Sequence, residues 1–154
     1  MASAEQQQHL FNFDRDLARF AKALQIELVT LMKKIGFDLL ARIVSRTPVD
    51  TGRARASWVI TIGDPSETTA PAGEHKQYQT GEAPSPPAGV VAVEQASAAL
   101  ASVQAYDDIW IANNLPYIER LEHGHSGQAP SGMVALAIQE TETELDVALR
   151  EVPG

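Results

Sequence analysis

The chain has 154 residues, of which 44% are hydrophobic and 21% are charged, values that are ordinary for one globular domain large enough to bury a core. It contains no cysteine, which excludes disulfides and thiolate metal sites and fits a reducing cytoplasm. No apolar run approaches the roughly 20 residues of a membrane span, and the Gln-rich start has neither the basic region nor the apolar core of a signal peptide.

The net charge of −8 is unevenly distributed along the chain. Residues 1–63 carry a net charge of +3, with nine Lys/Arg and six Asp/Glu, whereas residues 64–154 carry −11, with three Lys/Arg and fourteen Asp/Glu. An acidic total argues against a dedicated nucleic-acid-binding protein, which needs a basic patch. The opposite charges of the two halves can pair within one subunit or between neighbouring subunits.

Residues 1–12 are predicted to be a flexible N-terminal arm, and the short apolar segment 10–14 is either a lead-in strand or an arm that docks on a neighbour. Asp14 or Asp16 can cap the helix that follows. This helix is predicted from an apolar 3–4 spacing over about seven turns. Gly36 lies inside it and marks either a bend or a close packing contact. The spaced apolar residues are Leu17, Phe20, Leu24, Leu28, Leu31, Ile35, Leu39 and Ile43.

The stretch Thr47-Pro48-Val49-Asp50-Thr51-Gly52-Arg53 predicts a corner between a helix and a strand. Pro48 disfavours a helical conformation at Thr47, so the helix should end there. Gly52 can adopt the positive φ that a tight corner needs. Arg53 and Arg55 would then share one face of an extended segment.

A strand is predicted at residues 56–62, with Trp58, Ile60 and Ile62 on one face. Residues 64–89 contain five Pro and three Gly, with Tyr78 as the one large apolar side chain. Such a composition predicts a loop that is either mobile or ordered by a partner. A short helix at about residues 95–104 and a second strand at residues 109–113 follow.

A helical turn is expected from Leu115-Pro116, with Tyr117 and Leu121 facing inward and Gly124 ending it. Ser131 is positioned to cap the last helix, in which Glu140, Glu142 and Glu144 form a solvated acidic edge. The apolar stripe predicted for this helix is Val134, Ile138, Leu145, Leu149 and Val152. The order of elements predicts one α+β domain over residues 1–154. In it a small sheet packs against a long N-terminal helix and a C-terminal helix, with the Pro/Gly-rich loop between them.

His123 and His125, with Glu119 and Glu122 close by, are the candidate metal ligands, since zinc binds imidazoles and carboxylates. The other histidines, His9 and His75, fall in weakly structured segments and supply no third ligand. The segment therefore reads better as a glycine-rich interface loop. The chain has no Gly-x-Ser-x-Gly motif and no phosphate-binding loop, and Asp50 beside Thr51 is explained by turn chemistry. We expect no catalytic residues, no metal and no cofactor.

Two ordered sequence blocks carry a resemblance to a known family. The first is the corner with its following strand, "TPVDTGR.R.SW", and the second, from Asn113 to Val134, reads "NNLPY…RLE.G.S.QAP.GMV". Together they resemble the neck or tail-completion proteins of long-tailed bacteriophages, which are also called minor tail or head–tail joining proteins. The resemblance covers roughly residues 40–140, with the middle loop free to vary.

This resemblance implies a structural virion protein, not an enzyme, assembled in the host cytoplasm at the head-proximal end of the tail. Proteins at that position form rings, commonly of six copies, beside connector, tail-terminator or tail-tube proteins, and the genome passes through the lumen without specific binding. The charge distribution predicts subunit-interface residues, with Arg42, Arg46, Arg53 and Arg55 meeting carboxylates of the next copy. The predicted interface set is Arg53, Arg55, Glu119, Glu122, His123, His125 and Gln128. The alternatives are a metal-dependent enzyme centred on His123 and His125, or a monomeric adaptor module.

Overall fold

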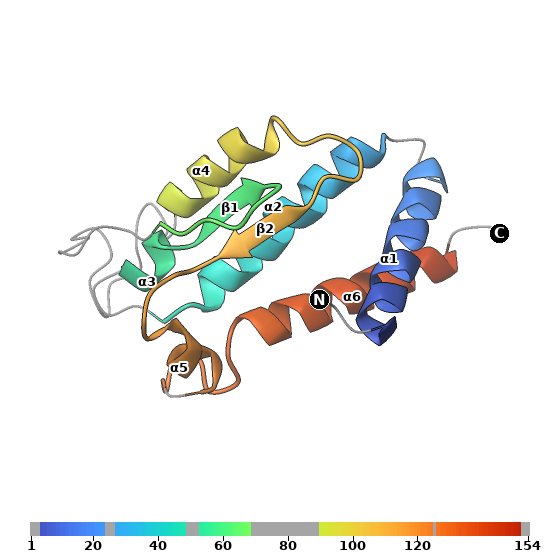
Figure 1. The fold of residues 1–154 in the computed structure, drawn as a ribbon. Helices are drawn as coiled ribbons and strands as arrows, with labels where there is room; N and C mark the ends of the chain where they lie inside the picture. The colour runs from blue at the N-terminus through green and yellow to red at the C-terminus, as the bar shows by residue number, and fades with distance from the viewer. Residues whose placement is uncertain (1–3, 24–26, 49–52, 69–89, 125, 152–154) are drawn as a thin grey trace.

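The computed structural model describes residues 4–23, 27–48, 53–68, 90–124 and 126–151 (Figure 1). The elements in these ranges are α1 (Ala4–Ala23), α2 (Leu28–Arg46), α3 (Arg53–Ala56), β1 (Val59–Ile62), α4 (Val90–Leu100), β2 (Ile109–Ala112), α5 (Ile118–Glu122) and α6 (Val134–Glu151). The expected mixed α+β class is confirmed, and the described part of the chain is mostly helical. The predicted corner residues 49–52 and loop residues 69–89 lie outside the described residues.

The two strands pair in an antiparallel sheet, in which Ile60 lies opposite Ile111 and Ile62 lies opposite Ile109. Because side chains alternate along a strand, these four isoleucines share one face. That face packs against the central core, while Trp110 on the other face is 42% exposed. The small sheet is therefore half-buried and depends on helices for its stability.

Helices α2 and α4 pack on each other and, with the sheet, enclose the main core. Gly36 of α2 is buried, and a β-carbon there would meet Leu100 of α4 and Ile109 of β2 at 3.4 and 3.6 Å. It marks a close packing contact, one of the two roles expected for it. The buried members of the main core are Leu40, Ile43, Val44, Trp58, Ile60, Ala92, Ala96, Leu100, Ala129, Met133 and Ala137.

The N-terminal prediction was wrong, because residues 4–23 form a helix where an arm followed by one long helix was expected. The chain instead forms two helices, and Glu27 immediately before α2 is extended, with φ −68° and ψ 141°. The break lets α1 turn back against α2, so that Leu17 and Ala21 are buried against Leu31 in a second, smaller cluster. A single continuous helix could not bring these three side chains together.

The first strand was predicted too long at its start. Residues Arg53–Ala56 form the short helix α3, closed by a 3.0 Å hydrogen bond from the backbone N–H of Ser57 to the carbonyl of Arg53. Arg53 and Arg55 consequently lie on a helical turn and do not share one face of an extended segment, as was expected. The end of α2 was predicted correctly, since Thr47 is extended (ψ 126°) directly before Pro48.

Three expectations for the C-terminal half also need correction. Helix α4 begins at Val90 and ends at Leu100, earlier than predicted. Tyr117 is 38% exposed and does not face inward, and Ile138 of the expected α6 stripe is 42% exposed. Ala137 is the buried side chain among those described in α6.

Candidate assembly surfaces

The first motif is organised around Thr47, which is fully buried at the end of α2. Its Oγ1 donates a hydrogen bond to the carbonyl of Ile43 at 2.8 Å and accepts one from Trp58 Nε1, also at 2.8 Å. Trp58 is itself only 4% exposed, so its N–H needs a partner inside the protein. The hydrogen bonds of Thr47 and Trp58 therefore hold the end of α2 against the start of β1.

Arg55 closes the same corner from the solvent side. Its Nε donates to the carbonyl of Thr47 at 2.6 Å, and its Nη2 donates to the carbonyl of Ser45 at 3.2 Å. Carbonyls in the last turn of a helix lack partners within that helix and carry partial negative charge, so a guanidinium is well suited to them. Burial lowers the pKa of the Arg55 side chain. Arg55 thus acts as a cap on α2.

The second motif contacts the first through Asn113, whereas Asn114 contacts the segment that follows β1. Asn113 Nδ2 donates to the carbonyl of Ala54 at 2.9 Å, and its Oδ1 accepts from the backbone N–H of Leu115 at 3.2 Å. Asn114 Nδ2 donates to the carbonyls of Ser66 and Thr68 at 2.6 and 3.0 Å. The two sequence blocks, about 60 residues apart, therefore form one continuous framework at one end of the sheet.

Glu122, the last residue of α5, caps the following long helix. One carboxylate oxygen accepts from the backbone N–H groups of Met133 and Val134, and the other accepts from Ala135, all at 2.9 Å. Burial acts to raise the pKa of Glu122, but these three hydrogen bonds and the charge of His123 outweigh it, so the pKa lies below its ordinary value. The expected cap, Ser131, is exposed and is not the residue that performs this role.

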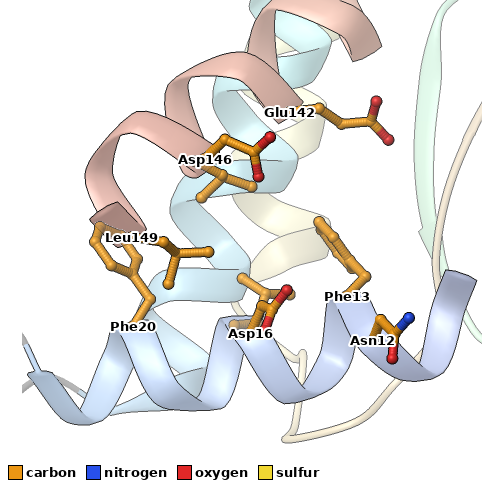
Figure 2. A pocket seen from close by; sticks show the side chains of 9 residues that line it. Asn12, Phe13, Asp16, Phe20, Glu142, Asp146 and Leu149 are labelled. Carbon is orange, nitrogen blue, oxygen red and sulfur yellow. The ribbon is translucent and has the colours of Figure 1, made fainter. Parts of the chain in front are cut away.

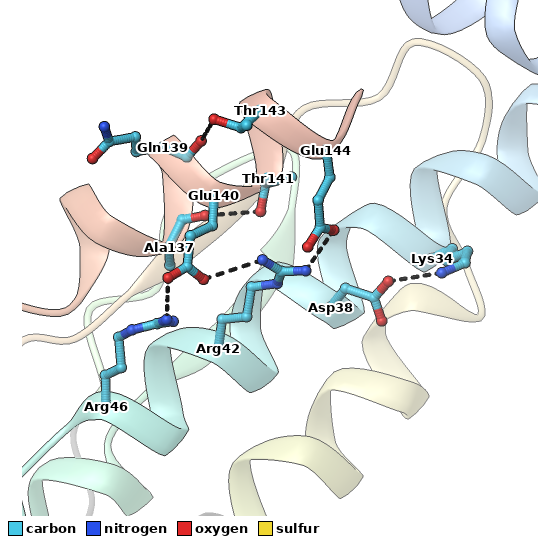
Figure 3. A network of polar contacts seen from close by, with 10 residues as sticks. All are labelled: Lys34, Asp38, Arg42, Arg46, Ala137, Gln139, Glu140, Thr141, Thr143 and Glu144. Atoms are coloured by element: carbon cyan, nitrogen blue, oxygen red, sulfur yellow. Dashed lines mark hydrogen bonds and ion pairs between the residues drawn. The ribbon is translucent and has the colours of Figure 1, made fainter. Parts of the chain in front are cut away.

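An ion-pair network joins α2 to α6 (Figure 3). Arg42 donates to Glu140 at 3.2 Å and to Glu144 at 2.6 Å, and Arg46 pairs with Glu140. The side chains of Glu140 and Glu144 are 43% and 66% exposed, which agrees with the expected solvated acidic edge, but both also bind arginines of α2. Arg42 and Arg46 were expected to meet carboxylates of a neighbouring subunit; here both bind carboxylates of their own chain, and pairing between subunits stays a prediction.

The predicted interface residues have separate roles in the fold. Arg55 and Glu122 are engaged in the helix caps described above, and Arg53 is half-buried on α3. Glu119, His123 and Gln128 are exposed on α5 and the loop after it. His125 lies outside the described residues.

The described part of the structure shows no metal-binding arrangement of the candidate ligands. Within the described ranges, no group of three or more His, Asp or Glu side chains is placed to hold a metal ion. The Glu122 carboxylate, one of the candidate ligands, is directed at backbone N–H groups of α6.

The sequence did not predict two apolar grooves that flank α1. One, of about 290 Å³, lies between α1, α2 and the start of β2. The other, of about 210 Å³, lies between α1 and the C-terminal half of α6 (Figure 2). They were missed because Phe13 was assigned to an arm. The i, i+4, i+7 spacing of Phe13, Leu17 and Phe20 is the signal that could have placed all three on one helical face.

No match to a known protein was found in any of three comparisons: with protein-family models, with curated proteins, and with solved structures. Among the helices that the structure describes, none combines the length and apolar character needed to cross a membrane.

Proposed function

We propose that this chain is a structural protein of the phage neck, a ring-forming tail-completion or head–tail joining component at the head-proximal end of the tail. The support is the resemblance of the two ordered blocks to that family. The observation that carries the proposal is the hydrogen bond between Asn113 of the second block and Ala54 of the first. Blocks that form one framework are better explained as one inherited structural unit than as two chance similarities.

The roles of the motif residues agree with a structural function. Thr47, Trp58 and Arg55 fix the end of α2, and Glu122 fixes the start of α6. Thr47, Arg55 and Glu122 bind backbone groups of their own chain, and Trp58 binds the Thr47 hydroxyl, so these side chains hold the helices in a fixed relation. A protein that works by surface complementarity needs such a rigid frame, because ordering the surface during assembly costs free energy.

The proposed partners are other copies of the chain, commonly six in a ring, and the connector, tail-terminator or tail-tube proteins on either side. The net charge of −8 suits a ring through which DNA passes, since like charge keeps the genome from adhering to the lumen. The protein would be made in the host cytoplasm and retained in the virion.

Disrupting the coding sequence in its phage genome tests this role. We expect filled heads and separate tails in electron micrographs of the lysate, and infectious joined particles when the intact chain is supplied from a plasmid. As a matched control, the disrupted phage is supplied with the Asn113→Ala variant from the plasmid. Joining of heads to tails should be restored only to the extent that this variant remains folded. Normal infectious particles without the chain would contradict the proposal.

A further inference from the structure

The groove between α1 and α6 has an apolar floor and an acidic rim. Figure 2 shows Phe13 and Phe20 rising from α1 toward α6, with the carboxylates of Asp16, Glu142 and Asp146 around the opening. Asp146 lies on an exposed stretch of α6, and Asp16 is 3.7 Å from its neighbour Arg15. The floor consists of Phe13, Leu17, Phe20, Leu145 and Leu149.

The size of this groove fits a protein side chain better than a small ligand. Its volume of about 210 Å³ is below the roughly 300–1,000 Å³ that is usual for small-molecule sites. Helix α1 belongs to a small cluster separate from the main core, and Leu145 and Leu149 of α6 are only half-buried. An apolar surface of this kind, ringed by one sign of charge, fits a partner with an apolar anchor next to a cation.

The same chain presents such a surface on α5, at the opposite end of the molecule (Figure 1). Tyr117 is 38% exposed, and Arg120, three residues later and also exposed, lies on the same side of the helical turn. Arg120 makes no ion pair with any residue in the described ranges. An exposed tyrosine beside an arginine is typical of the residues that dominate interface energetics.

Other exposed apolar residues in the described ranges fit the groove less well. Tyr106 is followed by Asp107 and Asp108, which the acidic rim would repel. Trp110 is held against its own chain by a 2.7 Å hydrogen bond from its Nε1 to the carbonyl of Gly63. Ile138 and Val147 both lie on α6, the helix that forms one wall of the groove.

We propose that α5 of one copy docks into the α1–α6 groove of the next copy. The Tyr117 ring would pack on Phe13, Phe20 and Leu149, and the Arg120 guanidinium would pair with Asp146 and Asp16. This contact joins two different surfaces, so repeating it produces a ring when the rotation closes. The inference rests on the proposed ring, and it names the surfaces that build it.

Cross-linking tests the contact directly, because the chain has no cysteine of its own. The double variant carries Glu119→Cys, next to Arg120 in the sequence, and Val147→Cys, next to Asp146. Both positions are exposed. A short bismaleimide reagent should cross-link the double variant into a ladder of covalent oligomers, from dimers up to the complete ring. The control pairs Glu119→Cys with Glu94→Cys, an exposed position on α4, and should give no ladder.

Light scattering on the same samples separates this inference from the proposed function. A ring-sized mass without a ladder overturns the docking of α5 and leaves the ring intact. If the purified protein has the mass of a monomer and neither it nor assembled particles give cross-linked products, both the docking of α5 and the proposed ring are overturned.

Charge reversal gives a second readout that does not depend on cysteine chemistry. Arg120→Glu should weaken self-association by about tenfold, because the rim would then repel it, and its circular dichroism spectrum should remain that of the parent. Adding Asp146→Arg should restore association by reversing the pair. Association of Arg120→Glu at the parental strength, or a double variant weaker than either single one, overturns the proposal.

Discussion

The side-chain amide of Asn113 donates a hydrogen bond to the carbonyl oxygen of Ala54 at 2.9 Å. The bond is partly buried and joins two segments that are far apart in sequence. It satisfies the carbonyl of Ala54 in the short helix α3, while the amide oxygen orders the turn before α5.

Replacing Asn113 by Ala should destabilise the folded chain by about 1–2 kcal/mol, because it leaves a partly buried carbonyl and the Leu115 N–H without their partner. Asn114→Ala is the matched control. Its hydrogen bonds are solvent-exposed, so the expected loss is below about 1 kcal/mol. Urea denaturation of both variants gives the comparison, and an equal loss in the two would contradict the framework role of Asn113.

Thr47 and Trp58 should behave as a coupled pair. Thr47→Val leaves the buried indole N–H without an acceptor, which costs about 1–3 kcal/mol. Trp58→Phe removes that donor, so Thr47→Val should cost less in a Trp58→Phe background. A double-mutant cycle measured by chemical denaturation checks this, and strictly additive free energies would show that the hydrogen bond is unimportant.

Glu122→Gln should destabilise the protein in a pH-dependent manner. Because the pKa of Glu122 is lowered on folding, its stabilisation is fully present above the ordinary value of 4.5 and is lost as the pH falls through the lower folded value. The deficit of the variant should be about 1–2 kcal/mol at pH 7 and should shrink below pH 4.5. Glu119→Gln, on the exposed side of α5, is the control, and a deficit that is constant with pH would contradict the cap.

Gly132 should tolerate no side chain. Its φ is +82°, and a β-carbon there would collide with the backbone carbonyl of Glu122. Gly132→Ala should therefore cost more than the roughly 1–2 kcal/mol of a left-handed residue alone. Gly127→Ala in the same loop is the control, since nothing lies within 4 Å of its added carbon. Thermal unfolding compares the two, and equal melting temperatures would be inconsistent with the close approach of the loop to α5.

The parts of the fold that could be predicted from the sequence are those set by local chemistry. Pro48 determines where α2 ends, and the alternating isoleucines of the two strands determine which face of the sheet is buried. The break between α1 and α2 could not be predicted in this way. The apolar spacing from Leu17 to Ile43 continues through it, and only the tertiary contact of Leu17 with Leu31 shows that the chain turns back.

The polar contacts between helices were harder to predict because they join residues distant in sequence. Arg42 and Glu140 are 98 residues apart, so charge counting alone could not decide between pairing within a subunit and pairing between subunits. Glu122 caps a helix that begins 12 residues later, whereas the usual capping signals lie within a few residues of the helix start.

The most direct test of the proposed function is a cryo-electron microscopy map of the particle neck. We predict a closed ring of this chain between the connector and the tail tube, with α5 of each copy against the α1–α6 groove of the next. A complete neck map with no density for this chain would contradict the account.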